Sequence, residues 1–186
     1  MTKKPVRADA YRNRERLLAS ARQAFSSGAD KVSLEAIARD AGVGIGTLYR
    51  HFPTREALVE AVYRAELGKL CDSAAELLAV QPPDAALRAW MDRFGDYLTT
   101  KREMAGALRA VIASGAVTSS QTRAQMSTAV MTMLKAGASD GTLRDDVHAE
   151  DVVASLLGVF LACGQPQQRD QAERMLDLLM DGLRPR

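Results

Sequence analysis

The sequence has few of the residues that mark disulfide-rich, metal-binding and membrane proteins. Cys71 and Cys163 are the only cysteines among 186 residues, and neither has another cysteine or a histidine nearby at ligand spacing. We therefore expect no disulfide framework and no metal site. Neither an apolar signal-peptide core nor a run of about eighteen apolar residues is present, which predicts a cytoplasmic protein without a membrane partner.

Aromatic residues are also scarce, at 5% of the chain, and long alternating runs of Val, Ile and Thr are missing. Such runs are typical of strands, so their absence argues against a β-rich fold. Ala, Leu, Met, Arg and Glu instead recur at helical spacing, and 47% of the residues are hydrophobic. The sequence therefore predicts an all-α fold of about nine helices, with a small N-terminal domain and a larger helical body.

The charged residues are distributed unevenly, although the net charge is only +2. Residues 1–55 hold eleven Lys and Arg against five Asp and Glu, a net charge of +6. Residues 56–186 hold fourteen against eighteen, a net charge of −4. A basic segment of this kind is typical of a surface that docks onto a polyanion, although a merely solvated basic surface has the same composition.

The most informative segment is residues 33–58, SLEAIARDAGVGIGTLYRHFPTREAL. Ser33 is placed to cap a first helix, and Gly42 then lets the chain turn with a positive φ. A second helix over about 45–51 turns Leu48 inward, and the whole unit, residues 33–52, has the pattern of a helix-turn-helix. An ordinary helical hairpin shares the turn and the apolar positions, but it does not require basic and aromatic side chains on the free face.

Eight residues of this segment are candidates for contact with DNA, because they are hydrogen-bond donors or glycines on the free face or at helix starts: Ser33, Gly44, Gly46, Thr47, Tyr49, Arg50, His51 and Arg55. Side chains of the second helix would face a major groove, and the two glycines would allow a close backbone approach. Arg55 begins the next helix, whose N-terminus favours a phosphate. Ser33 suits either a phosphate contact or the cap alone. The sequence does not distinguish which of the eight candidates contact bases and which contact phosphates.

Residues 46–58, GTLYRHFPTREAL, resemble the signature of the TetR family of bacterial transcriptional repressors, and the likeness extends over roughly residues 10–65. Arg55 departs from the family, which often has lysine there, but both side chains are cationic. Beyond residue 65 the resemblance is one of architecture only. It implies a regulator that is not an enzyme, needs no cofactor and is released from its operator by a small-molecule effector.

A single recognition helix reads only a few base pairs, so we expect a homodimer on a palindromic operator of double-stranded DNA. We place a basic tail at residues 1–8, the helix-turn-helix domain at 9–58 and an effector-binding and dimerisation domain at 59–186. The tail suits either a solvated terminus or an arm in the minor groove. The remaining helices are expected at about residues 9–27, 55–79, 85–99, 102–113, 120–139, 149–163 and 168–183.

Methionine and aromatic residues recur in the expected body helices. Such residues adapt to apolar ligands, although an ordinary core has the same composition. The resemblance implies an effector pocket here, and the candidates for it are Trp90, Met91, Phe94, Tyr97, Met104, Leu108, Met126, Met131 and Phe160. The effector is expected to be largely apolar.

The last two expected helices carry small and apolar residues that suit close helix packing. A two-fold four-helix interface and packing within one protomer both explain that pattern. The candidate interface residues are Ala154, Leu157, Gly158, Leu161, Ala162, Leu176, Leu179, Met180 and Leu183.

Two other kinds of function are open. One is an enzyme with a DNA-binding head, although the sequence shows no nucleophile elbow, phosphate-binding glycine loop or paired catalytic histidine. The other is a DNA-binding protein without sequence preference, which competition against random duplex would reveal. A redox sensor that uses the two cysteines is a weaker variant, since neither thiol has a visible activating base.

Overall fold

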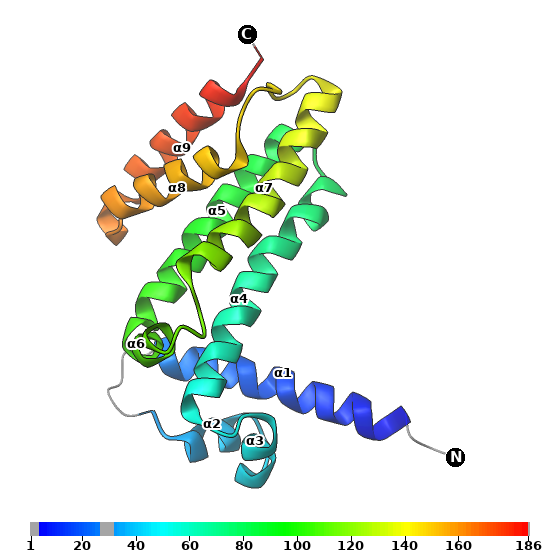
Figure 1. Cartoon of the computed structure of the whole chain (residues 1–186), viewed down its shortest axis with the longest axis vertical. Helices are drawn as coiled ribbons and strands as arrows, with labels where there is room; N and C mark the ends of the chain where they lie inside the picture. The colour runs from blue at the N-terminus through cyan, green and yellow to red at the C-terminus, as the bar shows by residue number, and fades with distance from the viewer. Residues whose placement is uncertain (1–3, 27–31, 186) are drawn as a thin grey trace. The chain divides into compact units, whose positions relative to one another are not determined.

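A computed structural model describes residues 4–26 and 32–185 of the chain. Within these ranges the chain forms nine α-helices, one short 3-10 helix and no strand, which confirms the predicted all-α class (Figure 1). No helix in the described part is both long and apolar enough to span a membrane.

The chain divides into two compact units. The first unit comprises residues 1–66 and 100–117, and the second comprises residues 67–99 and 118–186. The first unit contains α1 (Lys4–Ser26), α2 (Leu34–Asp40), α3 (Ile45–His51), α6 (Ala105–Ala113) and the start of α4 (Arg55–Leu78). The second contains most of α5 (Pro83–Glu103), α7 (Ser119–Asp140), α8 (Ala149–Ala162), η1 (Pro166–Gln168) and α9 (Arg169–Leu183).

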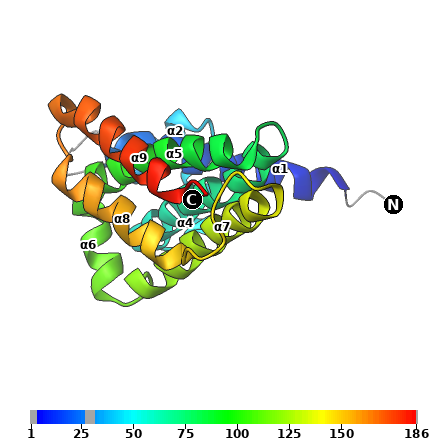
Figure 2. The ribbon, with the colours of Figure 1, turned by 90° about the horizontal axis from the view of Figure 1, so that it is seen from above.

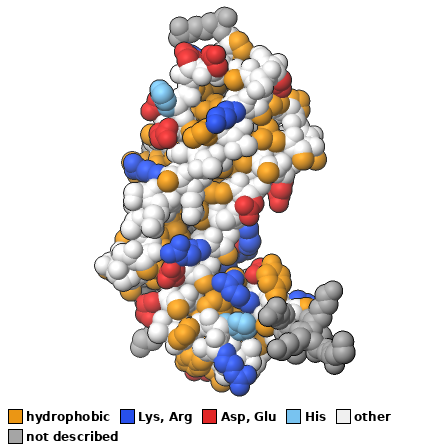
Figure 3. Space-filling model, turned by 45° about the vertical axis from the view of Figure 1, so that its right-hand side comes forward, with side chains coloured by type: hydrophobic (Ala, Val, Ile, Leu, Met, Phe, Trp, Pro, Cys, Tyr) orange, Lys and Arg blue, Asp and Glu red, His pale blue; other side chains and the backbone are white. Residues whose placement is uncertain are grey.

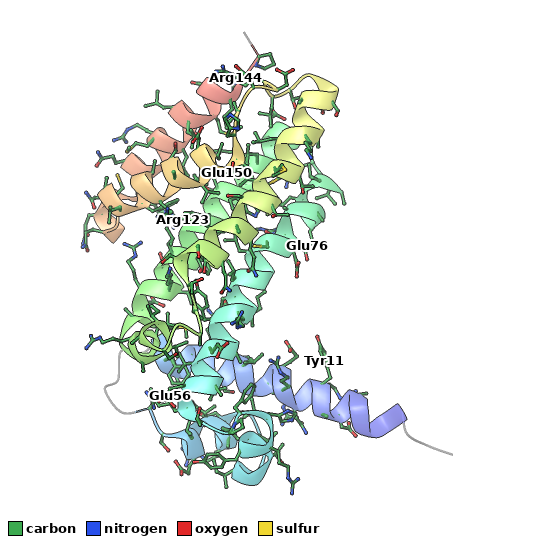
Figure 4. All side chains as sticks on the ribbon, in the orientation of Figure 1. Tyr11, Glu56, Glu76, Arg123, Arg144 and Glu150 are labelled. Atoms are coloured by element: carbon green, nitrogen blue, oxygen red, sulfur yellow. The ribbon has the colours of Figure 1, made fainter. Side chains whose placement is uncertain are left out.

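Helix α1 begins at Lys4, which is five residues before the predicted start at Asp9. Proline at the second helical position costs no hydrogen bond, because first-turn N–H groups have no intrahelical partner. The helix therefore includes part of the expected tail, whose residues 1–3 lie outside the described ranges. The exposed side chain of Tyr11 points away from α1 (Figure 4).

The core of the first unit comes from apolar residues of α1, the helix-turn-helix and the start of α4. All are at most 6% exposed: Leu17, Leu18, Ala21, Phe25, Ile37, Ala38, Leu48, Phe52 and Leu58. The inward position predicted for Leu48 is confirmed, and Phe52 directly after α3 is buried as well. A shared core of this kind fixes α2 and α3 against α1.

Helix α5 is longer than the predicted helix over residues 85–99, since it begins at Pro83 and ends at Glu103. Proline is favoured at the first helical position, and Asp84 then lies in the first turn, where a carboxylate is favourable. Because α5 takes up residues 102 and 103, α6 begins only at Ala105, three residues later than predicted.

Helices α8 and α9 of the second unit lie side by side (Figure 1 and Figure 2). Arg88 of α5 reaches α9, with Nε 3.0 Å from Oδ1 of Asp177, while its Nη1 is 2.6 Å from Oδ1 of Asp92. At the C-terminal end of α9, the backbone N–H of Arg144 donates to the Leu183 carbonyl at 2.9 Å. Arg144 is labelled in Figure 4. These contacts anchor α9 within the second unit.

Candidate nucleic-acid interface

The Ser33 side chain is engaged within α2. Its Oγ accepts a hydrogen bond from the Ala36 N–H at 3.2 Å, which confirms the predicted cap. The same hydroxyl donates to Oε2 of Glu35 at 2.8 Å, and this bond lowers the pKa of the Glu35 carboxyl below its ordinary value. The geometry therefore accounts for Ser33 as a cap without a contact to DNA.

The turn between α2 and α3 is built on Gly42, whose φ of +64° confirms the predicted left-handed conformation. The Gly42 N–H donates to the Arg39 carbonyl, and the Val43 N–H donates to the Ala38 carbonyl, both at 2.9 Å. These bonds satisfy carbonyl groups at the end of α2. The chain then enters α3 through Gly44, which has extended backbone angles.

Helix α3 has one anchored side and one open side. Leu48 is fully buried, whereas Tyr49 is 45% exposed and Arg50 is also exposed. Thr47 and His51 are half-buried at the edges of the open side. The guanidinium group of Arg50 and the phenol ring of Tyr49 thus project from a short helix whose opposite side is packed into the core through Leu48. A helix that reads a major groove requires this arrangement.

Gly44 and Gly46 border the same open side. A Cβ atom built on either residue would have no other atom within 4 Å, and neither residue has a positive φ. The packing of this chain therefore does not explain why these positions lack side chains. Both glycines are exposed, so the backbone at the start of α3 is accessible at these two positions.

Arg55 at the start of α4 is half-buried and bonded inside the first unit. Its Nη1 donates to the Val32 carbonyl at 2.7 Å, and its guanidinium carbon lies 5.2 Å from the centre of the Phe25 ring. The adjacent Thr54 Oγ1 accepts from the Ala57 N–H at 3.1 Å and thereby caps the start of α4. Arg55 thus holds the segment before α2, and any phosphate contact would use its remaining N–H groups.

Two arginines of α1 contact the helix-turn-helix. The guanidinium carbon of Arg14 lies 5.4 Å from the centre of the Phe52 ring. Arg16 donates from Nε to the Ala41 carbonyl at 2.8 Å and from Nη2 to the Gly42 carbonyl at 2.9 Å. From the sequence, both residues are expected on the polar side of α1, where some of the arginines could touch phosphate. The contacts within the protein depend on how α1 crosses α2, which the sequence does not specify.

Lys and Arg side chains gather with a histidine on the visible surface around α2 and α3 (Figure 3). Arg39 of α2 has a side chain that is 78% exposed, with Nε 3.9 Å from Oδ1 of Asp40. Cations concentrated around an open recognition helix attract the phosphates of a duplex.

The predicted effector residues do not all lie in one unit. Met104 and Leu108 belong to the first unit, and the other candidates belong to the second. Met131 is 39% exposed, whereas Trp90, Met91 and Phe94 are fully buried. The second unit brings aromatic rings together: the Phe94 ring centre lies 5.8 Å from that of Trp90, 5.8 Å from that of Phe160 and 6.5 Å from that of Tyr97. Met126 is also buried.

The predicted dimer residues fall into two groups. Four residues of α8 are exposed, namely Ala154, Gly158, Leu161 and Ala162, whereas Leu176, Met180 and Leu183 of α9 are buried within the protomer. Leu157 and Leu179 are half-buried. Leu161 is 87% exposed, and Leu178 of α9, which the sequence pattern did not single out, is 71% exposed.

The two cysteines lie in different surroundings. Burial raises the pKa of the Cys71 thiol to about 11, and the Asp72 carboxylate adds to the rise. Cys163 is 5% exposed, with its Sγ 3.6 Å from Sδ of Met175. Within the described residues, no group of three or more His, Cys, Asp and Glu side chains is arranged to hold a metal ion.

The raised pKa of Cys71 predicts a slow reaction with iodoacetamide. The thiolate is the reactive form, and a pKa of about 11 in place of 9.0 keeps the thiol protonated until the pH approaches 11. Alkylation of Cys71 at pH 8 should therefore be about a hundredfold slower than in the urea-unfolded chain. Peptide mass spectrometry measures each cysteine separately, and equal rates in the folded and unfolded chains would contradict the prediction.

Comparison with known proteins agrees with this arrangement. Residues 82–185 match the family model described as "Transcriptional regulator SbtR-like, C-terminal domain". Residues 17–62 match the model "Bacterial regulatory proteins, tetR family".

Individual relatives extend over different parts of the chain. A crystal structure of a TetR transcriptional regulator from Streptomyces coelicolor is 53% identical, with a TM-score of 0.81, over 92% of this chain and 98% of that one. A TetR transcription regulatory protein from Mycobacterium vanbaalenii is 34% identical, with a TM-score of 0.76, over 97% of this chain and 100% of that one. An HTH-type transcriptional regulator of Staphylococcus aureus strain USA300 is 38% identical over 63 residues, which are 33% of this chain and 34% of that protein. The chain thus matches about a third of the length of that curated relative. The chain belongs to the TetR family of transcriptional regulators, whose helix-turn-helix binds DNA.

Proposed function

We propose that this protein is a cytoplasmic repressor that binds a palindromic operator on nucleoid DNA as a homodimer and leaves it when a small, largely apolar effector binds. The observation that carries the proposal is the open side of α3. Tyr49 and Arg50 project from a helix that the buried Leu48 fixes in place, beside two glycines with free space around them. Such a helix suits insertion into a major groove.

The open side of α3 and the edges of that side have different roles in this proposal. Arg50 and Tyr49 face base edges, while Thr47 and His51 at the edges of the helix contact bases or phosphates. A guanidinium group fits the O6 and N7 acceptors of guanine, so Arg50 is the first candidate for base recognition. Gly44 and Gly46 let the backbone approach the duplex.

The proposed dimer uses the exposed side of α8 and α9. Leu161 and Leu178 are large apolar side chains at 87% and 71% exposure, and the exposed Ala154, Gly158 and Ala162 permit close helix approach. A second copy of the chain covers such a surface symmetrically. The dimer presents two α3 helices to half-sites roughly 34–36 Å apart, or a multiple of this distance.

The proposed effector site lies among the aromatic side chains of the second unit. The rings of Trp90, Phe94, Tyr97 and Phe160 meet there, and Met91 and Met126 are buried in the same unit. Aromatic and methionine side chains accommodate apolar ligands. Release requires that the effector binds one conformation of the dimer better than the other.

Selection of bound duplexes from a random DNA pool tests the proposal. Enrichment of a two-fold symmetric sequence with half-sites about one helical turn apart is expected. Equal retention of all sequences would instead assign the chain to sequence-neutral DNA binders. An asymmetric single half-site would refute binding as a dimer.

Replacement of Arg50 by alanine should weaken binding to the selected operator by about 1–3 kcal/mol, because the base contact is lost. Fluorescence anisotropy with the operator and with a random duplex measures the effect. Arg39→Ala is the matched control, since it removes the same charge from the exposed surface of α2. It should change binding to both duplexes equally. Unchanged operator affinity in Arg50→Ala would refute the assignment of α3.

A further inference from the structure

Helix α2 is held at both ends by arginines from other helices. Arg55 of α4 donates to the Val32 carbonyl immediately before the Ser33 cap. Arg16 of α1 donates to the Ala41 and Gly42 carbonyls at the opposite end. These carbonyls lie at the C-terminal end of α2 and in the turn, where backbone oxygens lack helical partners and a cation is favourable.

The contact of Arg16 reaches the turn that orients α3. Only Val43 and Gly44 separate Gly42 from the first residue of α3. A Cβ atom on Gly42 would lie 2.5 Å from Nη2 of Arg16, so the guanidinium occupies the space that glycine leaves free. The positive φ of Gly42 and the position of Arg16 thus belong to one local arrangement.

The chemistry of this contact is specific to arginine. Nε and Nη2 are neighbouring donors of one planar group, and they bind two successive carbonyl oxygens at 2.8 and 2.9 Å. A lysine keeps the positive charge but has a single ammonium nitrogen without this fixed fork. A plain phosphate contact, in contrast, depends mainly on the charge.

We infer that Arg16 is a positioning residue for DNA recognition: it fixes the turn after α2 and thereby the angle at which α3 meets the base edges. The inference rests on the proposed reading of an operator by α3. Arg16 contributes to the preference for the operator over other DNA through this geometry. It contributes little to the attraction between the protein and phosphates.

Arg16→Lys in the full-length protein tests the inference, with circular dichroism used to confirm that the variant is folded at the assay temperature. Affinity for the operator selected by the unchanged protein should fall about tenfold, the loss expected for a charge-assisted hydrogen bond. Affinity for a random duplex of equal length should change less than about twofold, and the slope of log affinity against log salt should stay the same.

Arg12→Lys is the matched control, because Arg12 lies one turn away on α1 and pairs with Asp9. It should leave the ratio of operator to random-duplex affinity unchanged. A ratio in Arg16→Lys equal to that of the unchanged protein would overturn the inference. So would a parallel loss for both duplexes in an Arg16→Ala variant together with a shallower salt slope, because these identify a phosphate contact.

Amide hydrogen exchange on the free protein tests the same contact without DNA. The Val43 N–H, which donates to the Ala38 carbonyl, should exchange about tenfold faster in Arg16→Lys than in the unchanged protein. The Ala57 N–H in the cap of α4 serves as an internal reference. Unchanged exchange at Val43 would overturn the inference even if no operator is found, whereas the absence of a preferred duplex alone would refute only the proposed function.

Discussion

Replacement of both Leu161 and Leu178 by aspartate should convert the proposed dimer into a monomer and lower operator affinity at least about a thousandfold. Each leucine is lost twice in a two-fold interface, and burial of one such side chain is worth about 1.5–3 kcal/mol. The four new carboxylates would also lie unpaired between the protomers. Sedimentation velocity measures the mass, and anisotropy titration measures the affinity.

Val80→Asp is the matched control for this pair, because Val80 is 77% exposed but belongs to the segment between α4 and α5 and not to α8 or α9. It removes an exposed apolar side chain and adds the same charge. The control should therefore leave both the mass and the operator affinity unchanged. A double variant that keeps its dimeric mass would refute the α8 and α9 interface.

The helix-turn-helix was predictable in detail because its determinants are local. A cap at Ser33, a positive φ at Gly42 and the inward Leu48 each depend on residues within one or two turns of the chain. The structure confirms all three. The family itself was recognised from a run of residues in the same segment, which the matching family models confirm.

The roles of the arginines were not predictable from the same sequence. Arg16 is one of several arginines on the polar side of α1 and Arg55 begins α4, yet each binds a backbone carbonyl 23 to 26 residues away in the chain. Helical periodicity identifies a polar face without specifying which group that face meets. The partner of a long cationic side chain depends on the crossing of helices, which a single sequence does not specify.

The side chains of α9 also show that helical periodicity alone does not specify which residues are buried. Leu176 and Leu178 are both leucines on an amphipathic helix, but the first is 1% exposed and the second 71% exposed. Periodicity gives the direction of the stripe only to within about one residue position, or 100° around the helix. The pattern therefore led to Leu176 as an interface candidate and missed Leu178.

Replacement of Trp90 by alanine should lower the free energy of unfolding by about 3–5 kcal/mol. Trp90 is fully buried, and its indole Nε1 donates to the Leu70 carbonyl at 2.8 Å. The substitution thus removes the ring contact with Phe94 and this hydrogen bond, and it leaves a cavity between α4 and α5 of the second unit. Urea denaturation followed by circular dichroism measures the change, since Trp90 is the only tryptophan and its loss removes the intrinsic fluorescence probe.

Two further variants separate the contributions at this site. Trp90→Phe keeps an aromatic ring but loses the bond to Leu70, so it should cost less than Trp90→Ala, at about 1–3 kcal/mol. Ile112→Ala, at an exposed position of α6, should change the unfolding free energy by less than about 0.5 kcal/mol. A loss below about 1 kcal/mol in Trp90→Ala would show that the ring contributes little to the core. The role of Trp90 would then be limited to contact with the bound effector, because a side chain that lines a ligand site need not stabilise the unliganded protein.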